Sequence, residues 1–473
     1  MIGPGRRVGD LSSSEISGQP EPTRWVIGCP LFVVIAQGGA FVVVVDRERC
    51  AYCGSCVSLC PVNAIFLAET RIQIDERCTE CGLCVASCPL GAIRPEQETR
   101  QAKVLPRKRY DVVVVGGGPA GSTVARVVAT AGLSVLLVEK RQEIGSPVRC
   151  AEGVGYAALL DFMTPDPAWI SAEISAAYYG VVQGGREEGA RHAEDALTGF
   201  VLERRVFDRV LAENAVSAGA DVLVKATAKQ LLRDGGVLPA GVQVAVNGDL
   251  LEVECRVVVG ADGVESRVGQ WFGLDVRLAP RDSMPCAQYL LTGIDIDPSC
   301  LYFYVGNEIA PGGYVWIFPK GDGRANVGLG VQSNVATRPA LDYLERFIAE
   351  RPFLAQGSPV TLIVGNAPIA IARGPVVADG CVLVGDAARQ VDPLTGGGII
   401  NAMVAGRIAG ETIITALEAG DVSAEALRLY QTRWEAGPGR KMARNYRIKE
   451  RFAAEQRTSR DFVRLFAAST GSK

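Results

Sequence analysis

From Tyr110 onward, the spacing of apolar and polar residues predicts a chain that contains both strands and helices. The apolar run at 112–115 is followed by a glycine-rich turn, a helix-like stretch and a second apolar run that ends before Glu139. Continuous apolar runs of this length are typical of strands in a parallel sheet that is covered on both faces. Strand-like and helix-like runs then alternate to about Gly410, which predicts an α/β domain over 110–410 with an inserted antiparallel sheet.

The remaining segments differ in pattern from this domain. The inserted sheet is expected at about 280–365, where Tyr314, Trp316 and Phe318 alternate with smaller residues. Side chains two residues apart share one face of a strand, so these three aromatic residues are expected on one face. Residues 411–473 have a helical character that is interrupted at 437–439.

The N-terminal part contains a compact cysteine-rich unit at 41–98 with an internal duplication. Its first residues, FVVVVD, predict an opening strand. Residues 1–40 are interpreted as a tail that is mostly flexible, and the basic residues 99–109 as a linker.

Eight cysteines of this unit form two runs that each read C-x2-C-x2-C-x3-C-P. The spacing matches the bacterial two-cluster ferredoxin pattern, in which the fourth cysteine of each run ligates the other [4Fe–4S] cluster. Zinc knuckles, or clusters with a purely structural role, are the alternatives; two neighbouring clusters favour an electron relay. The expected ligand sets are Cys50, Cys53, Cys56 and Cys88 for one cluster, and Cys78, Cys81, Cys84 and Cys60 for the other.

The turn after residue 115 has the G-x-G-x-x-G spacing of a dinucleotide-binding motif, with Gly116, Gly118 and Gly121. Such glycines allow a tight turn, close approach of a pyrophosphate, and packing of the following helix on the sheet. Glu139 ends the next strand, where an acidic residue binds ribose hydroxyls. The pattern therefore predicts a bound dinucleotide.

Two later segments, 257–269 and 382–399, resemble the second and third motifs of FAD-dependent hydroxylase-like proteins, and 202–211 resembles their arginine segment. The resemblance favours FAD over NAD. It implies an FAD-binding Rossmann-like domain behind a ferredoxin module, that is, an α/β and α+β multidomain chain with a helical C-terminus. The cofactor contacts that it implies are Gly116, Gly118, Ala120, Gly121, Glu139, Lys140, Cys150, Ala151, Gly153, Arg204, Ala228, Asp262, Asp386, Gly397, Gly398 and Ile399.

Two segments narrow the resemblance to the geranylgeranyl reductase family: GSPVRCAEGV at 145–154 and PGGYVWIFPKGDGRANVGLG at 311–330. In that family, an FAD domain reduces isolated double bonds of polyprenyl chains, as in archaeal lipid precursors or polyprenyl diphosphates. The resemblance makes Cys150 a candidate proton donor or flavin-positioning group, and a packed small apolar side chain is the alternative. Candidate substrate contacts, which are otherwise core residues of the inserted sheet, are Pro311, Tyr314, Trp316, Phe318 and Pro319.

The fused clusters indicate the direction of electron flow. They would deliver single electrons from an upstream donor to a flavin, which releases them in pairs as hydride. The covalent link gives the donor a high effective concentration. An FAD and iron–sulfur oxidoreductase that acts on a quinone is the main alternative, and an FAD hydroxylase or halogenase is another.

Composition excludes several other functions. The net charge is −3, which gives no signature of nucleic-acid binding. The single histidine, His192, lies in the charged segment REEGARHAED, which we interpret as a solvated loop, so a histidine-based triad or zinc site is not expected. Thiolate ligands require a reducing environment, which favours the cytoplasm.

Two segments raise the question of membrane contact. The uncharged stretch from Trp25 to Val45 approaches the roughly 20 residues of a membrane span, but Pro30, Gly38 and Gly39 interrupt it. Residues 440–464 are rich in Arg and Lys with interleaved aromatic residues. Such a helix either lies on an anionic membrane, at its inner face, or packs on its own domain.

Overall fold

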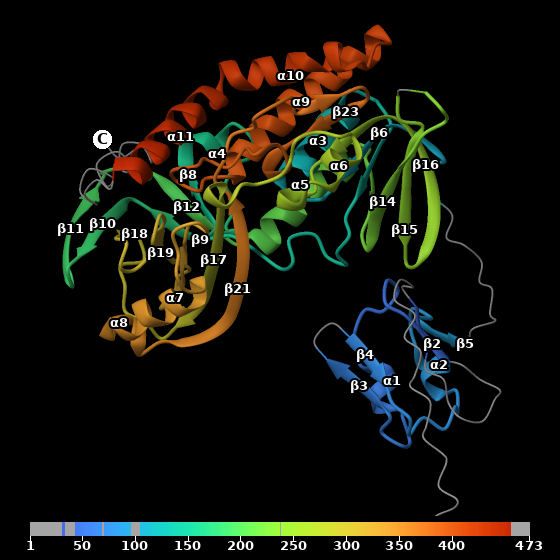
Figure 1. Cartoon of the computed structure of the whole chain (residues 1–473), viewed down its shortest axis with the longest axis horizontal. Coiled ribbons are helices and arrows are strands. Elements are labelled where there is room, and N and C mark those ends of the chain that lie inside the picture. The colour runs from blue at the N-terminus through green and yellow to red at the C-terminus, as the bar shows by residue number, and fades with distance from the viewer. Residues whose placement is uncertain (1–30, 34–42, 69–70, 96–104, 237, 456–473) are drawn as a thin grey trace, which may run out of the picture. The chain divides into compact units, whose positions relative to one another are not determined.

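The computed structural model describes residues 31–33, 43–68, 71–95, 105–236 and 238–455 (Figure 1). The chain divides into two compact units, Met1–Glu98 and Thr99–Lys473. Most of the apolar stretch from Trp25 to Val45 lies outside the described residues, as do the basic residues beyond 456.

The first unit is built from two similar halves around one small core. A three-stranded sheet has the order β1 (Leu31–Val33), β2 (Val43–Asp46) and β5 (Ile93–Pro95). Strands β3 (Ile65–Ala68) and β4 (Arg71–Ile74) form a hairpin, and each half carries a short helix, α1 (Ser55–Ser58) or α2 (Leu83–Ser87). The opening strand is confirmed as β2. Residues 31–33 lie in the segment that was expected to be a tail, but they form β1 and pair with β2.

The second unit contains a sheet of the predicted α/β type. Its strand order is β13 (Asp221–Leu223), β7 (Val135–Val138), β6 (Arg109–Val115), β16 (Asp249–Gly260), β15 (Gly241–Val246) and β14 (Ala226–Leu232), with β22 (Val377–Ala378) and β23 (Cys381–Leu383) beside β16. Strands β6 and β7 are parallel, and Val112, Val113 and Val114 have no exposed surface. Helix α3 packs on β6 and β7, and the antiparallel strand β14 also contacts β7. Because consecutive residues of β6 are buried, both faces of this strand are covered, which explains the uninterrupted apolar run.

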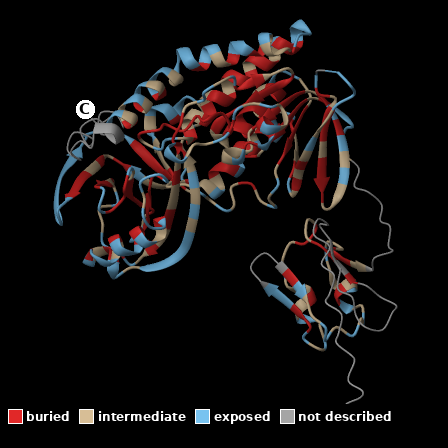
Figure 2. Cartoon of the chain, in the orientation of Figure 1, coloured by how far each residue is buried: buried red, intermediate tan, exposed pale blue. Residues whose placement is uncertain are grey.

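Helices α3 (Pro119–Thr130) and α9 (Ile399–Ala419) pack against each other on this sheet. Among the described residues, α9 is the one helix long and apolar enough to cross a membrane. Most of it is buried, and Figure 2 shows it in the interior of the unit, so it is a core helix. The expected domain boundary at 410/411 falls inside this helix.

The inserted sheet has seven strands in the order β11 (Arg186–Ala193), β10 (Ala176–Gln183), β18 (Cys300–Val305), β19 (Tyr314–Pro319), β20 (Arg324–Gly330), β17 (Ser283–Thr292) and β21 (Ser358–Pro368). Helix α7 (Ala340–Ala349) covers β17 and β20 on one face and is followed by α8 (Pro352–Ala355). Strands β17 to β21 match the expected range of about 280–365. The expectation omitted β10 and β11, which join this sheet because β10 pairs with β18 from a distant part of the chain.

The solvated-loop interpretation of His192 was wrong. Residues 186–193 form the edge strand β11, which pairs with β10 across a turn at Gly184 and Gly185. All eight side chains are exposed, because an edge strand next to water tolerates polar residues on both faces. Two glycines between paired runs are a hairpin signal that the charged composition concealed. The His192 ring packs edge-on against Tyr179.

A third, smaller sheet connects the two large ones and has the order β8 (Gly153–Gly155), β12 (Gly199–Leu202) and β9 (Ile170–Ile174). Helices α4 (Tyr156–Leu160) and α5 (Arg204–Ser217) flank it, and α6 (Arg267–Trp271) follows the turn η1 (Gly263–Glu265). Short 3-10 turns, η2 (Pro280–Asp282) and η3 (Gly385–Ala388), precede β17 and α9.

The chain ends, as far as it is described, in α10 (Ala424–Ala436) and α11 (Pro438–Glu455). The predicted interruption at 437–439 is confirmed, because Gly437 separates the two helices. Helix α11 buries the side chains of Met442, Asn445 and Lys449. Over its described residues it therefore packs on its own unit, which is one of the two interpretations given for this segment.

Candidate active site

The eight predicted cluster ligands gather in two cavities of the first unit. Cys60 lines one cavity together with Cys78, Cys81 and Cys84, although it belongs to the other sequence run. Conversely, Cys88 lines the second cavity together with Cys50, Cys53 and Cys56. This exchange of the fourth cysteine is the arrangement that the ferredoxin pattern predicts.

The backbone around both cavities is shaped so that cysteine sulfurs can bind a cluster and accept hydrogen bonds. Gly54 and Gly82 begin α1 and α2 with φ angles of 78° and 75°, which only glycine adopts freely. Backbone N–H groups of Ala64 and Ala92 donate to the sulfurs of Cys60 and Cys88 at 3.2 and 3.1 Å. Burial, together with the neighbouring thiols, raises the pKa of Cys84 to about 11. Thiolates in this place therefore need the compensating charge of iron, and the residues fit iron–sulfur clusters.

The glycine-rich turn of the second unit is shaped for a phosphate. A Cβ atom on Gly116 would collide with the carbonyl of Ala261, and one on Gly121 would collide with the carbonyl of Gly116. Gly118 caps α3 and has no protein atom within 4 Å of an added Cβ, which leaves space at the helix N-terminus. Ala120 lies buried in the first turn of α3. Helix N-termini of this kind bind anionic phosphate groups.

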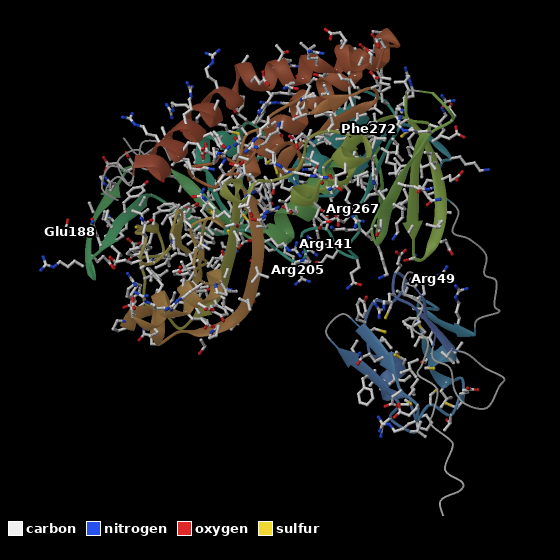
Figure 3. All side chains as sticks on the ribbon, in the orientation of Figure 1. Arg49, Arg141, Glu188, Arg205, Arg267 and Phe272 are labelled. Atoms are coloured by element: carbon white, nitrogen blue, oxygen red, sulfur yellow. The ribbon has the colours of Figure 1, made fainter. Side chains whose placement is uncertain are left out.

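Glu139 lies at the end of β7, beside this turn. Its carboxylate accepts hydrogen bonds from the backbone N–H of Gly117 and of Arg141, each at 2.9 Å. The Arg141 side chain is labelled in Figure 3, and burial lowers its pKa. The neighbouring Lys140 forms an ion pair with Glu265 at 2.7 Å, with both side chains about half exposed. The structure therefore brings the predicted ribose-binding acid next to the predicted phosphate turn.

The second and third flavoprotein motifs each contain a partly buried carboxylate, Asp262 and Asp386. Asp262 Oδ2 accepts from the backbone N–H of Val268 at 3.0 Å, whereas its buried Oδ1 has no hydrogen-bond partner among the described residues. Burial raises the pKa of Asp262, and it also raises that of Asp386 against the opposing charges of Arg204 and Arg389. A buried oxygen without a donor is costly unless a ligand supplies one. The hydroxyl groups of FAD can donate such a hydrogen bond, so they fit this requirement.

The loop 391–398 and the N-terminus of α9 stand next to Asp386. Gly398 caps α9 and Ile399 is its first residue. A Cβ on Gly398 would lie 3.9 Å from Asp386 Oδ1, so the start of α9 and Asp386 are close to each other. Gly397 is exposed at the end of the loop. Ala228 lies elsewhere, buried in β14.

Arg204 and Cys150 are close partners. The Arg204 guanidinium forms two hydrogen bonds to Asp208, at 3.1 and 2.7 Å. Burial lowers the pKa of Arg204, but the charges of Asp208 and Cys150 and their hydrogen bonds together outweigh this and raise it above the ordinary value. Burial also raises the pKa of the Cys150 thiol, while Arg204 opposes that rise. Cys150 is therefore a protonated thiol at neutral pH, which suits a proton donor.

The three aromatic residues of β19 share one face, as predicted. Tyr314, Trp316 and Phe318 pack with Tyr179, Phe303 and Leu394, whereas Val315 and Ile317 face the opposite core beneath α7. Pro311 lies in the loop before β19, and Pro319 is its last residue. The partly buried Ala151 and Cys286 adjoin the same aromatic cluster.

Hydrogen bonds connect this aromatic face to the loop of the third flavoprotein motif and to the segment that carries Cys150. The Tyr314 hydroxyl donates to the carbonyl of Thr395, in the loop 391–398, at 2.5 Å. Trp316 Nε1 donates to Gln288 Oε1 at 2.8 Å, and Gln288 Nε2 donates to the carbonyl of Cys150 at 3.1 Å. Phe318 lies so close to Gly153 that a Cβ there would meet its ring at 2.8 Å. The candidate substrate face and the candidate cofactor residues thus form one site.

Sequence reasoning missed a buried network that holds the segment around Cys150. Glu152 has a φ of 76°, an unfavourable backbone conformation for this residue. Its Oε2 accepts from Lys320 Nζ and Asn326 Nδ2, both at 2.7 Å, and its Oε1 accepts from the Arg204 backbone N–H at 2.8 Å. Glu152 lies in the family-like segment 145–154, and Lys320 lies in the family-like segment 311–330. This shared membership was the signal in the sequence that could have pointed to the pair.

Comparisons with known proteins identify the domains and the relatives of this chain. The model of the geranylgeranyl reductase catalytic domain matches residues 282–367, that of FAD dependent oxidoreductases matches 111–278, and that of the 4Fe-4S binding domain matches 43–66 and 72–94. A digeranylgeranylglycerophospholipid reductase of Methanothrix thermoacetophila is 48% identical over 348 residues, which are 73% of this chain and 88% of the relative. A reductase of the same name from Methanocella arvoryzae is 47% identical over 345 residues, 73% of this chain and 87% of the relative.

Solved structures show the same relationship. A geranylgeranyl bacteriochlorophyll reductase-like protein of Thermoplasma acidophilum has a TM-score of 0.72 at 38% identity and covers 77% of this chain and 92% of its own. The flavin-dependent brominase Bmp2, at 19% identity and a TM-score of 0.59, covers 77% of this chain and 94% of its own, and shares the fold alone. The chain therefore belongs to the geranylgeranyl reductase family of FAD-dependent oxidoreductases and carries 4Fe-4S binding domains in the same polypeptide.

Proposed function

We propose that this protein saturates the isolated double bonds of geranylgeranyl chains in a glycerophospholipid, with electrons that arrive through two [4Fe–4S] clusters of the same chain. The relatives named for this lipid substrate, at 44–48% identity, support the substrate class. The observation that carries the proposal is the aromatic face of β19, which hydrogen bonds join to the loop 391–398 and to the peptide of Cys150.

Bound FAD would supply the hydride, and the clusters would supply it with single electrons from an upstream donor. The residues of the chain have three tasks. The side chains of Tyr314, Trp316 and Phe318, each less than a tenth exposed, offer an apolar wall that excludes water from a prenyl chain. The Cys150 thiol holds a proton, because burial keeps its pKa high. The Glu152 network fixes the peptide that carries this thiol.

The substrate is a membrane lipid, so we further propose that the protein works in the cytoplasm at the inner face of the membrane. The thiolate ligands of the clusters support a reducing compartment. Helix α11 does not supply an apolar membrane face over its described residues, because Met442 and Ile448 contact the rest of the unit. The basic residues beyond 456 lie outside the described chain.

The test uses the full chain, purified without oxygen and reduced with dithionite. Incubation with a geranylgeranyl glycerophospholipid is expected to add one H2 to the lipid mass for each double bond that is saturated. The variant Cys150→Ser should lose most of this activity while it retains bound flavin, and Cys300→Ala, a buried thiol of β18, should behave like the unchanged protein. Flavin that a quinone analogue reoxidises, without any gain in lipid mass, would overturn the proposal in favour of a quinone oxidoreductase.

A further inference from the structure

Helix α11 buries polar side chains where a helix resting on a surface would bury apolar ones. Asn445 has no exposed surface and Lys449 is only 6% exposed. Between them on the sequence, Ile448 packs against the aromatic cluster of Tyr314, Trp316 and Phe318. Burying a polar group is costly unless it is hydrogen-bonded, so the partners of Asn445 and Lys449 indicate which parts of the unit α11 holds in place.

The partner of Asn445 is the carboxylate that shapes the loop 391–398. Asn445 Nδ2 donates to Asp392 Oδ2 at 2.7 Å, and Asp392 is itself only 5% exposed. The other oxygen, Asp392 Oδ1, accepts from the backbone N–H groups of Leu394 and Thr395 at 3.0 and 3.1 Å. One oxygen of the Asp392 carboxylate therefore binds two backbone N–H groups of its own loop. Asn445, on α11, binds the other oxygen.

The backbone of the same loop closes on Asp392 as well. The N–H of Asp392 donates to the carbonyl of Gly397 at 3.0 Å, and the N–H of Gly396 donates to the carbonyl of Asp392 at 2.9 Å. On the opposite side, the Tyr314 hydroxyl binds the carbonyl of Thr395. The loop that leads into α9 is thus fastened to β19 by one hydrogen bond and to α11 by another.

Separate contacts fasten α11 itself. Lys449 Nζ donates to the carbonyl of Ile369 at 2.7 Å and lies 3.4 Å from Asp282 Oδ1, which also accepts from the Tyr446 hydroxyl at 2.9 Å. None of these bonds of Lys449 and Tyr446 reaches residues 391–398, all of which the structure describes. Loosening the helix and releasing the loop are therefore distinguishable perturbations.

We propose that Asn445 is a positioning residue of the flavin site: by holding Asp392, it keeps the loop 391–398 in the shape that FAD requires. The inference rests on the proposed function only in that FAD binds beside this loop. Without the Asn445 donor, Asp392 Oδ2 is a buried carboxylate oxygen with one partner fewer, and the loop relaxes to hydrate it. FAD must then restore the original loop, and the cost of doing so appears as weaker binding.

The experiment titrates FAD into the flavin-free full chain and follows flavin fluorescence and the visible spectrum. For Asn445→Ala we expect the dissociation constant to rise about 5- to 100-fold, the range that follows from removing one partner of a buried charged hydrogen bond. The control Lys449→Met removes the ion pair that fastens the helix. It should lower the urea midpoint but change the dissociation constant for FAD by less than about 2-fold, because this site is independent of the loop.

An exchange of the two side chains tests the bond itself. Asp392→Asn keeps an oxygen for the N–H groups of Leu394 and Thr395, but it turns a donor toward position 445, where Asn445→Asp then supplies an acceptor. Each single change should weaken FAD binding, and the double change should recover it to within about 3-fold, since a coupled pair is not additive. Equal FAD affinity of Asn445→Ala and Lys449→Met, or no recovery in the exchanged pair, would overturn the proposal. These measurements use no lipid, so their result can be interpreted even if the proposed reductase function is wrong.

Discussion

Replacing Lys320 by methionine tests whether the buried network positions the segment that carries Cys150. The side chains of Lys320 and Glu152 are each 5% exposed, and their charged atoms are 2.7 Å apart. Methionine has a similar length and no charge, so the change leaves the Glu152 carboxylate buried without its cation. The positive φ of Glu152 would then be held only by its remaining bonds.

The magnitude follows from the bonds that remain. Removing one partner of a buried ion pair costs about 3–5 kcal/mol of unfolding free energy. Glu152 retains the Asn326 amide and the Arg204 backbone N–H, so the cost should fall near the lower value of about 3 kcal/mol. The double variant Glu152→Gln/Lys320→Met leaves no buried charge uncompensated and should recover more than about 1 kcal/mol of this loss.

Urea unfolding followed by tryptophan fluorescence is a suitable assay, because Trp169, Trp271, Trp316 and Trp434 all lie in the second unit. A unit of this size has an m-value at or above about 3 kcal/mol/M, so the expected shift of the midpoint is about 1 M or less. Lys108→Met, at an exposed lysine, should stay within about 0.5 kcal/mol of the unchanged protein.

Two results would refute this reasoning. A loss below about 1 kcal/mol for Lys320→Met would mean that the pair contributes no more than an exposed ion pair. Additive losses in the double variant would show that Glu152 and Lys320 are not coupled. In either case the network would not be what fixes the Cys150 peptide.

Three other predictions concern the cofactor sites and the thiol. Gly118→Ala should leave the unfolding midpoint unchanged, because its Cβ meets no protein atom within 4 Å, yet it should abolish FAD binding; retained binding by fluorescence titration would show that no phosphate occupies this space. Burial raises the pKa of Cys150, so iodoacetamide should label it only above the ordinary thiol range of about 8.5, as peptide mass spectrometry would show. The stability that the protonated Cys150 thiol contributes is therefore intact below the pKa that this thiol has in the unfolded chain. It is lost as the pH rises through the higher pKa of the thiol in the folded protein. Cys88→Ser should remove about half of the iron, since it takes one ligand from the cluster site of Cys50, Cys53 and Cys56; a full iron content would show that Cys88 is not a required cluster ligand.

The sequence by itself predicted several features that depend on residues a few positions apart, although it missed the local hairpin of β10 and β11. The C-x2-C-x2-C-x3-C spacing, the G-x-G-x-x-G turn and the alternation at Tyr314, Trp316 and Phe318 are local, because backbone geometry determines where side chains at fixed offsets point. The interruption at Gly437 is of the same kind. The family assignment rested on two local segments, 145–154 and 311–330, and the comparisons confirmed it.

Contacts between distant parts of the chain were decided only by the tertiary structure. Lys320 meets Glu152 across 168 positions, Gln288 meets Cys150 across 138, and Asn445 meets Asp392 across 53. Strand β10 likewise joins a sheet whose other members lie mostly after residue 283. Among 49 Lys and Arg and 52 Asp and Glu residues, the type of a residue does not say which few are buried or paired. Burial and pairing arise from the packing of complete elements, and that packing has no local signal for the sequence to show.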